Sequence, residues 1–282
     1  MPFTLSHPAA VLPLLRRPFS GAALVAGAVA PDMPYFVATV GLPVSAQSWY
    51  EPFTNATTTH TLPGALTVGL PYTLALWASF LAGRRPLASL LSLPVNVPQA
   101  RTAGAVIQRA AWVLLSALIG LATHLAWDSF THFDGFVVAR TPWLNSPLAG
   151  SLTWARALQH LSTVGGLVAI AVYGWRRRDR LRIGAGAGAG AAPRRVLLAL
   201  ALCAAAGAVA HAWRWLAGPD AGTAGQPLGA VLEGVLSDAA KGAGAGLIAA
   251  LALYVAGWWL RRAVAARRGT AYEDGSRAGT AA

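Results

Sequence analysis

The feature that most constrains this sequence is a series of long apolar runs separated by very few charged side chains. Hydrophobic residues make up 55% of the 282 residues, and charged residues make up only 11%. An ordinary globular protein carries roughly 25% charged residues, so a soluble chain of this length could not cover its surface with so few. Disorder is excluded as well, because a disordered chain needs low hydrophobicity. The composition therefore predicts an integral membrane protein.

A helix that crosses a bilayer needs roughly 20 mostly apolar residues. Six stretches are predicted to span: Ala22–Leu42, Leu62–Leu81, Ala110–Ser129, Leu158–Trp175, Val196–Leu216 and Ala243–Leu260. The first is interrupted by Pro31 and Pro34. The earlier segment Pro8–Leu15 is too short to span at about 1.5 Å per residue. We predict an all-α fold: a polytopic membrane helix bundle of about six transmembrane helices plus a short N-terminal re-entrant or interfacial helix.

The basic residues orient these helices. The formal net charge of +12 would, on its own, suggest a polyanionic partner such as nucleic acid. Most of the arginines, however, fall in alternate loops, chiefly 84–109, 176–195 and 261–277. Cytoplasmic loops are enriched in Arg and Lys, so we predict that both termini are cytoplasmic. Topology and anionic lipid explain a basic segment beside a membrane, and no nucleic-acid partner is expected.

The chain is expected to divide into four parts. Residues 1–175 form a helical membrane domain that holds all but one of the histidines. Residues 176–195 form a basic cytoplasmic loop, which contains a flexible Gly-Ala repeat over 184–192. Residues 196–260 form a C-terminal two-helix membrane hairpin, and residues 261–282 form a disordered cytoplasmic tail.

Ionisable residues inside apolar spans are costly and usually face a partner or a cavity. In a helix over 110–132, His124, Asp128 and His132 are spaced four residues apart and share one face. This places three side chains that can bind a metal near the outer interface. Two simpler interpretations stay open: His124 and Asp128 can hydrogen-bond each other at a helix end, and His132 can be a surface histidine.

Four further residues bring ionisable groups to the same side. Asp32 lies between two prolines, where the broken helix needs protein or a cavity to cover it, although a simple helix-boundary turn would look the same. His60 and His160 each open a predicted span at its outer end, as ordinary interfacial histidines also do. His7 precedes the short N-terminal segment, whose rise would carry it toward the middle of the bilayer, although its Ser-His-Pro context is also typical of a helix cap.

Seven such side chains can converge in the outer half of one bundle: His7, Asp32, His60, His124, Asp128, His132 and His160. A mixed imidazole and carboxylate set suits zinc, manganese or iron rather than a thiolate-type site. The single cysteine, Cys203, lies in an apolar run. We expect a divalent metal, with zinc favoured over manganese or iron. Such a metal could lower the pKa of bound water and polarise an ester or phosphoryl oxygen.

Four motifs carry a family resemblance: Met1-Pro-Phe-Thr-Leu-Ser-His7-Pro-Ala-Ala10, Ala30-Pro-Asp32-Met-Pro-Tyr-Phe36, Thr123-His124-Leu-Ala-Trp-Asp128-Ser-Phe-Thr-His132 and Leu158-Gln-His160-Leu-Ser-Thr163. Together they resemble a family of bacterial membrane proteins defined by domain of unknown function 4184. The resemblance covers residue 1 to about residue 175. It implies a multi-pass protein of the bacterial inner (plasma) membrane.

The order of the motifs is also similar, more distantly, to that of membrane-bound proteins described as metal-dependent hydrolases. That wider group resembles zinc phospholipase C and the P1-type nucleases, which are helical. Its early His, Pro-Asp, Thr-His-Ser and His-x-x-x-Asp have counterparts here in His7, Pro31-Asp32, Thr59-His60-Thr61 and His124 to Asp128. Thr61 stands where a serine is typical, and the His-Arg-Gly that often precedes the Thr-His is missing.

These patterns favour a metal-dependent hydrolase that acts on a phosphoester or an ester, including a lipid-like substrate in the bilayer. The expected metal ligands are His7, Asp32, His60, His124 and Asp128. His132 and His160 are the expected catalytic groups, as acid–base residues, as further ligands or as hydrogen-bond partners of the ligands.

Two non-enzymatic alternatives remain: a structural or assembly protein with an interhelical hydrogen-bond network, and a cation or proton transporter. The first predicts that His124→Ala lowers stability without changing metal content. The second predicts ion flux that Asp32→Asn abolishes.

Overall fold

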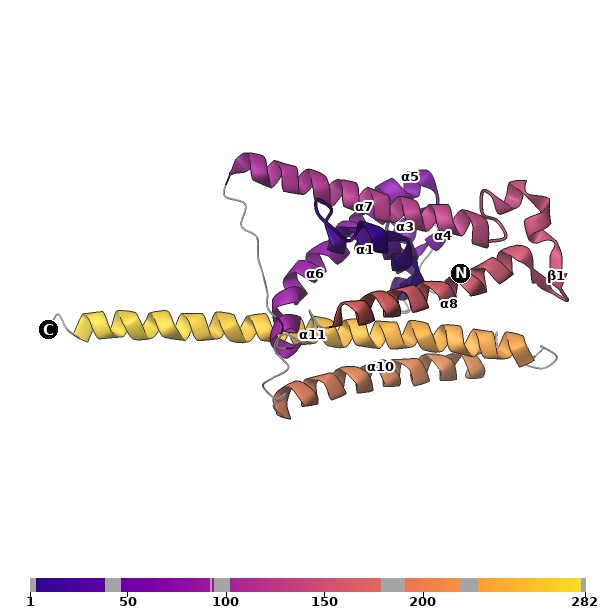
Figure 1. The fold of residues 1–282 in the computed structure, drawn as a ribbon. Coiled ribbons are helices and arrows are strands. Elements are labelled where there is room, and N and C mark those ends of the chain that lie inside the picture. Colours follow the sequence, from indigo (N-terminus) through magenta and orange to yellow (C-terminus); the bar gives the residue numbers. More distant parts are fainter. Residues whose placement is uncertain are drawn as a thin grey trace. The chain divides into compact units, whose positions relative to one another are not determined.

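The computed structural model describes residues 4–38, 47–91, 93, 102–178, 191–218 and 228–279 (Figure 1). Six of the described helices are long and apolar enough to cross a membrane: Gly21–Ala38, Leu62–Leu91, Ala103–Thr131, Trp154–Arg176, Pro193–Ala217 and Leu228–Arg267. Each overlaps one of the predicted spans, so the prediction of an all-α, polytopic membrane fold is confirmed.

The chain folds as two compact units. The first consists of Met1–Leu81 and Asn96–Ile183, and the second consists of Ala82–Val95 and Gly184–Ala282. Helix α6 (Leu70–Leu91) begins in the first unit and ends in the second. The other described elements of the first unit are η1 (Thr4–Leu14), α1 (Gly21–Val29), η2 (Ala30–Asp32), α2 (Met33–Ala38), α3 (Glu51–Thr54), α4 (Ala56–Thr59), α5 (Leu62–Gly64), η3 (Ala65–Gly69), α7 (Ala103–Thr131), η4 (Val138–Arg140), η5 (Pro142–Asn145), β1 (Pro147–Ala149), β2 (Leu152–Thr153) and α8 (Trp154–Arg176).

The first span is broken at its prolines, as the sequence predicts. The Ser20 side chain accepts a hydrogen bond from the Ala23 N–H and so caps the start of α1. Pro31 and Pro34 have no backbone N–H to donate, and the chain changes there from α-helix to the 3₁₀ turn η2 and back. Asp32 lies in this turn with no exposed surface. The break therefore directs a carboxylate into the protein interior.

Helices α1 and α7 cross at two glycines. A methyl group on Gly27 would lie 2.9 Å from the Leu121 nitrogen, and one on Gly120 would lie 2.9 Å from the Gly27 Cα. Real Cβ atoms do not approach so closely, so only glycine lets these backbones touch, as small residues do in membrane helix pairs. Asp32 follows Gly27 by five residues and His124 follows Gly120 by four. The crossing thus brings the two polar residues toward each other.

Element η1 is the short N-terminal segment, and it packs against α1 and α8. Its 11 residues form a 3₁₀ helix, because Pro8 and Pro13 lack the N–H groups that an α-helix would use. Such a helix is about 22 Å long at roughly 2 Å per residue, which is shorter than the ~30 Å hydrocarbon core. Gly166 of α8 makes room for it, since a Cβ there would lie 2.9 Å from the Ser6 Cβ. This packing buries His7.

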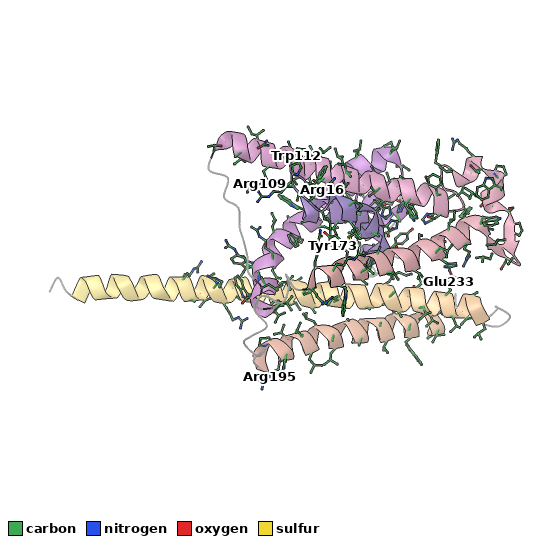
Figure 2. All side chains as sticks on the ribbon, in the orientation of Figure 1. Arg16, Arg109, Trp112, Tyr173, Arg195 and Glu233 are labelled. Carbon is green, nitrogen blue, oxygen red and sulfur yellow. The ribbon has the colours of Figure 1, made fainter. Side chains whose placement is uncertain are left out.

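Basic and acidic residues lie toward opposite ends of α7. Arg109 and Trp112 lie in its first third (Figure 2). The Trp112 ring contacts Phe19 edge-on, with 5.5 Å between the centroids, and Phe19 follows Arg16 and Arg17 closely in the chain. Asp128 lies in the last turn of the helix. This separation agrees with the charge pattern of the sequence, and which end faces the cytoplasm stays a prediction.

The second unit contains α10 (Ala191–Ala217), α11 (Leu228–Gly279) and the end of α6. Helices α10 and α11 lie antiparallel and side by side (Figure 1). They approach closely at Gly207 and Gly246, where a Cβ would overlap the backbone of the facing helix. The indole N–H of Trp259 donates a hydrogen bond to the Ala82 carbonyl at 3.0 Å.

Two predicted boundaries differ from the structure. Helix α11 continues through Gly279, so residues 261–279 are helical where the sequence predicts a disordered tail over 261–282. Ala and Arg dominate the start of this segment and favour helix, and extending an existing helix costs far less than starting one. Helix α10 begins at Ala191, so the end of the predicted loop 176–195 is also helical. The greater part of that loop, residues 179–190, lies outside the described residues.

Candidate metal centre

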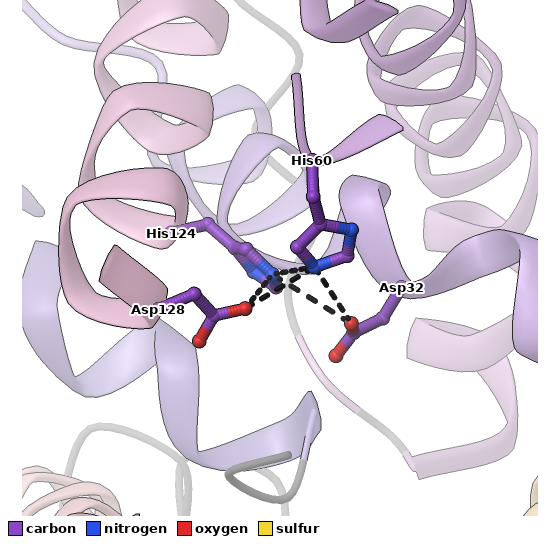
Figure 3. A group of neighbouring side chains, drawn as sticks. All are labelled: Asp32, His60, His124 and Asp128. Carbon is purple, nitrogen blue, oxygen red and sulfur yellow. Dashed lines mark hydrogen bonds and ion pairs between the residues drawn. The ribbon is translucent and has the colours of Figure 1, made fainter. Parts of the chain in front are cut away.

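Four ionisable side chains meet in the first unit (Figure 3). Asp32 comes from η2, His60 follows α4, and His124 and Asp128 lie one turn apart on α7. Each offers one ligand atom, and the four atoms all lie within 4.8 Å of one another. His60 is half-buried and the other three residues are buried. Folding therefore gathers three separate segments of the sequence around one point.

The Nε2 atoms of His60 and His124 both point toward the middle of the group (Figure 3). Each lies 3.1 Å from Oδ2 of Asp128 and 3.6 Å from Oδ1 of Asp32. The two Nε2 atoms are 3.3 Å apart. Two ligand atoms that bind one zinc ion tetrahedrally, each at about 2.0–2.2 Å, lie roughly 3.4 Å apart. The observed spacings match those of ligands around a single ion.

Backbone carbonyls determine which nitrogen of each ring carries the proton. His124 Nδ1 lies 2.8 Å from the Ala28 carbonyl oxygen, and His60 Nδ1 lies 2.7 Å from the Ala56 carbonyl oxygen. A carbonyl only accepts, so Nδ1 must donate in both rings. In the neutral rings the lone pair is then on Nε2, at the centre of the group. Metal-binding histidines characteristically donate their other N–H in this way.

The carboxylates of the group lack the partners that buried charges need. Neither oxygen of Asp32 has a hydrogen-bond partner among the described residues, and the same holds for Oδ1 of Asp128. In this part of the chain, every ion pair of the two carboxylates is with a histidine. Burying unpaired charge is costly. Two carboxylates and two neutral imidazoles would balance one divalent cation, so the donor set fits a zinc-type metal.

His7 lies directly against this group. Its ring stacks on that of His124, with 3.8 Å between the centroids and 19° between the planes. Its Nε2 is 3.6 Å from Oδ1 of Asp128 and has no hydrogen-bond partner among the described residues. Burial, and next the His124 imidazole, lower the pKa of His7 to about 3. The ring is therefore neutral near neutral pH and keeps a lone pair available.

His132 borders the group on its accessible side. It ends α7, where its backbone N–H donates to the Asp128 carbonyl. Its Nδ1 lies 3.6 Å from Oδ1 of Asp128. The side chains of His132 and His60 are 22% and 21% exposed, whereas those of Asp32 and His124 are fully buried. A small molecule would therefore reach the group past His60 and His132.

Comparison with known protein families matches residues 1–256 to a domain of unknown function, DUF4184. The chain belongs to this family. The match continues well past residue 175, where the sequence motifs end, so the family domain includes most of the C-terminal hairpin. No curated protein and no solved structure matches the chain.

Sequence reasoning missed Thr59 as a positioning residue. This side chain is fully buried, and its hydroxyl donates to the Pro31 carbonyl at 2.6 Å. The bond ties the segment that carries His60 to the turn that carries Asp32. A Thr59-His60 pair is visible in the sequence, but nothing there reveals that the hydroxyl reaches a proline 28 residues earlier.

His160 is the one predicted site residue that the structure leaves outside the group. It is exposed on α8. At about 100° per residue, it lies roughly 140° around the helix from the buried Ala155 and roughly 120° from Gly166, which contacts η1. The other six predicted residues lie together: His7, Asp32, His60, His124, Asp128 and His132.

Proposed function

We propose that this chain is an integral-membrane, metal-dependent hydrolase of phosphoesters or esters. Its metal, zinc in preference to manganese or iron, would be held by Asp32, His60, His124 and Asp128. The observation that carries the proposal is the arrangement of the two imidazoles, whose Nε2 lone pairs face each other at 3.3 Å between two carboxylates. Between neutral rings such an arrangement is repulsive without a metal ion, because the only N–H of each ring already donates to a backbone carbonyl.

A bound metal supplies Lewis acidity, which activates water and polarises an ester or phosphoryl oxygen. The protein supplies the rest. The carbonyls of Ala28 and Ala56 fix the rings of His124 and His60, which preorganises the site. Half-buried His132 stands at the accessible edge, where it can hydrogen-bond a substrate or hold a proton.

A lipid-like substrate is supported by the surroundings of that edge. The residues that follow His132 expose large apolar side chains: Phe133, Phe136, Trp143, Leu148 and Trp154. Aromatic side chains of this kind are typical of the membrane interface. A substrate with an apolar tail could therefore approach His132 from the bilayer. In keeping with the charge pattern, we place this edge at the outer leaflet of a bacterial inner membrane, with both termini in the cytoplasm.

The proposal is tested on protein purified with an affinity tag that does not bind metal. We expect a near-stoichiometric divalent metal, and hydrolysis of a chromogenic phosphoester or ester that stops on chelation and returns with zinc. His124→Ala should lose both, whereas the matched control His211→Ala, in the C-terminal hairpin, should keep both.

Three results would count against the proposal. Protein that stays metal-free after incubation with zinc or manganese would contradict the site. Metal binding without turnover of any ester would contradict the hydrolase. Loss of thermal stability in His124→Ala at unchanged metal content would identify a structural hydrogen-bond network instead.

A further inference from the structure

Two neighbouring buried atoms, one on Asp128 and one on His7, have no hydrogen-bond partner among the described residues and take no part in the first group. Oδ2 of Asp128 faces His60 and His124 at 3.1 Å, but Oδ1 of the same carboxylate points elsewhere and has no hydrogen-bond partner among the described residues. The Nε2 atom of His7 is likewise buried without a hydrogen-bond partner among the described residues. The His7 side chain is 2% exposed and that of Asp128 is 6% exposed, so water does not readily satisfy either atom.

These two atoms lie next to each other. His7 Nε2 is 3.6 Å from Asp128 Oδ1, which is the same spacing that separates Asp32 from each imidazole of the first group. It is too long for a hydrogen bond and close to the roughly 3.4 Å expected of two ligands on one ion. Stacking against His124 fixes the His7 ring in this position.

His132 brings a third ligand atom to the same oxygen. Its Nδ1 is also 3.6 Å from Asp128 Oδ1. Nδ1 lies 3.2 Å from the Asp128 carbonyl oxygen, which is longer than the 2.7 and 2.8 Å contacts that fix the proton on His60 and His124. That carbonyl already accepts the His132 backbone N–H. The Nδ1–H contact of His132 is therefore the weakest of the three, and Nδ1 would give up this proton to a metal most easily.

We propose that Asp128 bridges two divalent ions, with Oδ2 bound to the ion of the first group and Oδ1 bound to a second ion held by His7 and His132. The inference rests on the metal site of the proposed function, and it does not depend on hydrolysis. It would give Oδ1 of Asp128 and Nε2 of His7, both buried and without a hydrogen-bond partner among the described residues, a cation to bind. It also gives a role to the packing of η1 against α1 and α8, which brings a histidine to the cluster.

Metal stoichiometry tests the second site. Full-length protein in detergent, purified without a metal-binding tag and dialysed against zinc, should hold two equivalents of zinc by elemental analysis. His132→Ala and His7→Gln should each hold one, and the control His211→Ala should hold two. The His132 side chain is 22% exposed, so we expect its truncation to be tolerated, and this variant tests the site even where a change at buried His7 impairs folding.

Manganese supplies a second readout. Protein loaded with Mn²⁺ should give the electron paramagnetic resonance signature of a magnetically coupled pair, and His132→Ala should give that of an isolated ion. One equivalent in the wild type, abolished by His124→Ala, would overturn the second site while leaving the proposed function intact. Two equivalents retained in both His7→Gln and His132→Ala would overturn this assignment of ligands, and no bound metal at all would overturn both proposals.

Discussion

In the first unit α1 and α7 cross at Gly27 and Gly120, and in the second unit α10 and α11 cross at Gly207 and Gly242. At each crossing a Cβ on the glycine would collide with the backbone of the facing helix. Membrane helices commonly associate through small residues in this way. The two regions therefore share a mode of packing, and they differ in the side chains that the packing brings together.

A histidine follows the crossing by one turn in both units. In the first unit this is His124, which faces Asp32 and Asp128. In the second it is His211, which packs against Gly242, and the nearby carboxylate of Asp238 is paired with Lys241 at 2.5 Å.

Within the described ranges, a group of metal-ligating side chains forms only in the first unit. Close backbones bring side chains together in both units, but only the unpaired carboxylates and oriented imidazoles of the first unit could hold a metal ion.

The largest expected effect separates the two histidines. His124→Ala removes a ligand and should weaken zinc binding by more than the roughly 10–100-fold that changes in surrounding hydrogen bonds cause. His211→Ala should leave zinc affinity unchanged. Zinc titration of the metal-stripped variants, with a competing chelator of known affinity, measures both. An equal loss of zinc affinity in the two variants would contradict the proposed difference between the units.

The two crossings can be perturbed separately. Gly120→Val should force α1 from α7, lowering the free energy of unfolding by about 1–3 kcal/mol or more, and it should also weaken zinc binding. Gly207→Val should cost comparable stability but leave zinc affinity intact. Thermal unfolding and zinc titration in the same detergent distinguish these outcomes. Unchanged zinc binding in Gly120→Val would show that the crossing does not position the ligands.

Loss of the Thr59 hydroxyl should have a smaller effect. Thr59→Val keeps the shape of the side chain but removes the hydrogen bond to the Pro31 carbonyl, which is worth about 1 kcal/mol. We expect zinc affinity to fall roughly 10-fold, because His60 and Asp32 are no longer tied together. Thr59→Ser, which keeps the hydroxyl, should behave like the wild type. The zinc titration with a competing chelator measures these affinities. Equal zinc affinity in the wild type, Thr59→Val and Thr59→Ser would contradict a positioning role for Thr59.

The smallest expected effect on stability is that of Asp32→Asn, and it is an increase in the stability of the metal-free protein. Asp32 is fully buried and neither of its oxygens has a described hydrogen-bond partner, so its charge destabilises the metal-free protein. Asp32→Asn removes that charge and should stabilise the metal-free protein by on the order of 1 kcal/mol, while weakening zinc binding. Unfolding measured with and without zinc checks both. A variant that is less stable without metal would favour a structural ion-pair network.

Much of the fold could be predicted from the sequence, because length and apolarity decide which segments can span a bilayer. The candidate site could be predicted for a related reason: ionisable residues are rare in this chain, so Asp32, His124 and Asp128 stand out. The contacts that support these residues could not be predicted. The carbonyl of Ala28 acts through its backbone, and no side-chain pattern marks it.

Contacts that leave no pattern in the sequence also explain why one predicted site residue, His160, lies away from the cluster. His160 opens a span at the same level as the other residues in the predicted topology, but whether it faces the cluster depends on the rotation of α8. That rotation is set by the contact of Gly166 with Ser6, a pairing of small residues that carries no signal in either segment.

X-ray absorption at the zinc edge, on zinc-loaded protein, tests the central claim most directly. Zinc bound at this site should show a shell of nitrogen and oxygen ligands at about 2.0–2.2 Å, with imidazole scattering and no sulfur. This spectrum should be lost in His124→Ala and retained in His211→Ala. Zinc surrounded by water oxygens alone, or a spectrum that His124→Ala leaves unchanged, would contradict a metal centre at Asp32, His60, His124 and Asp128.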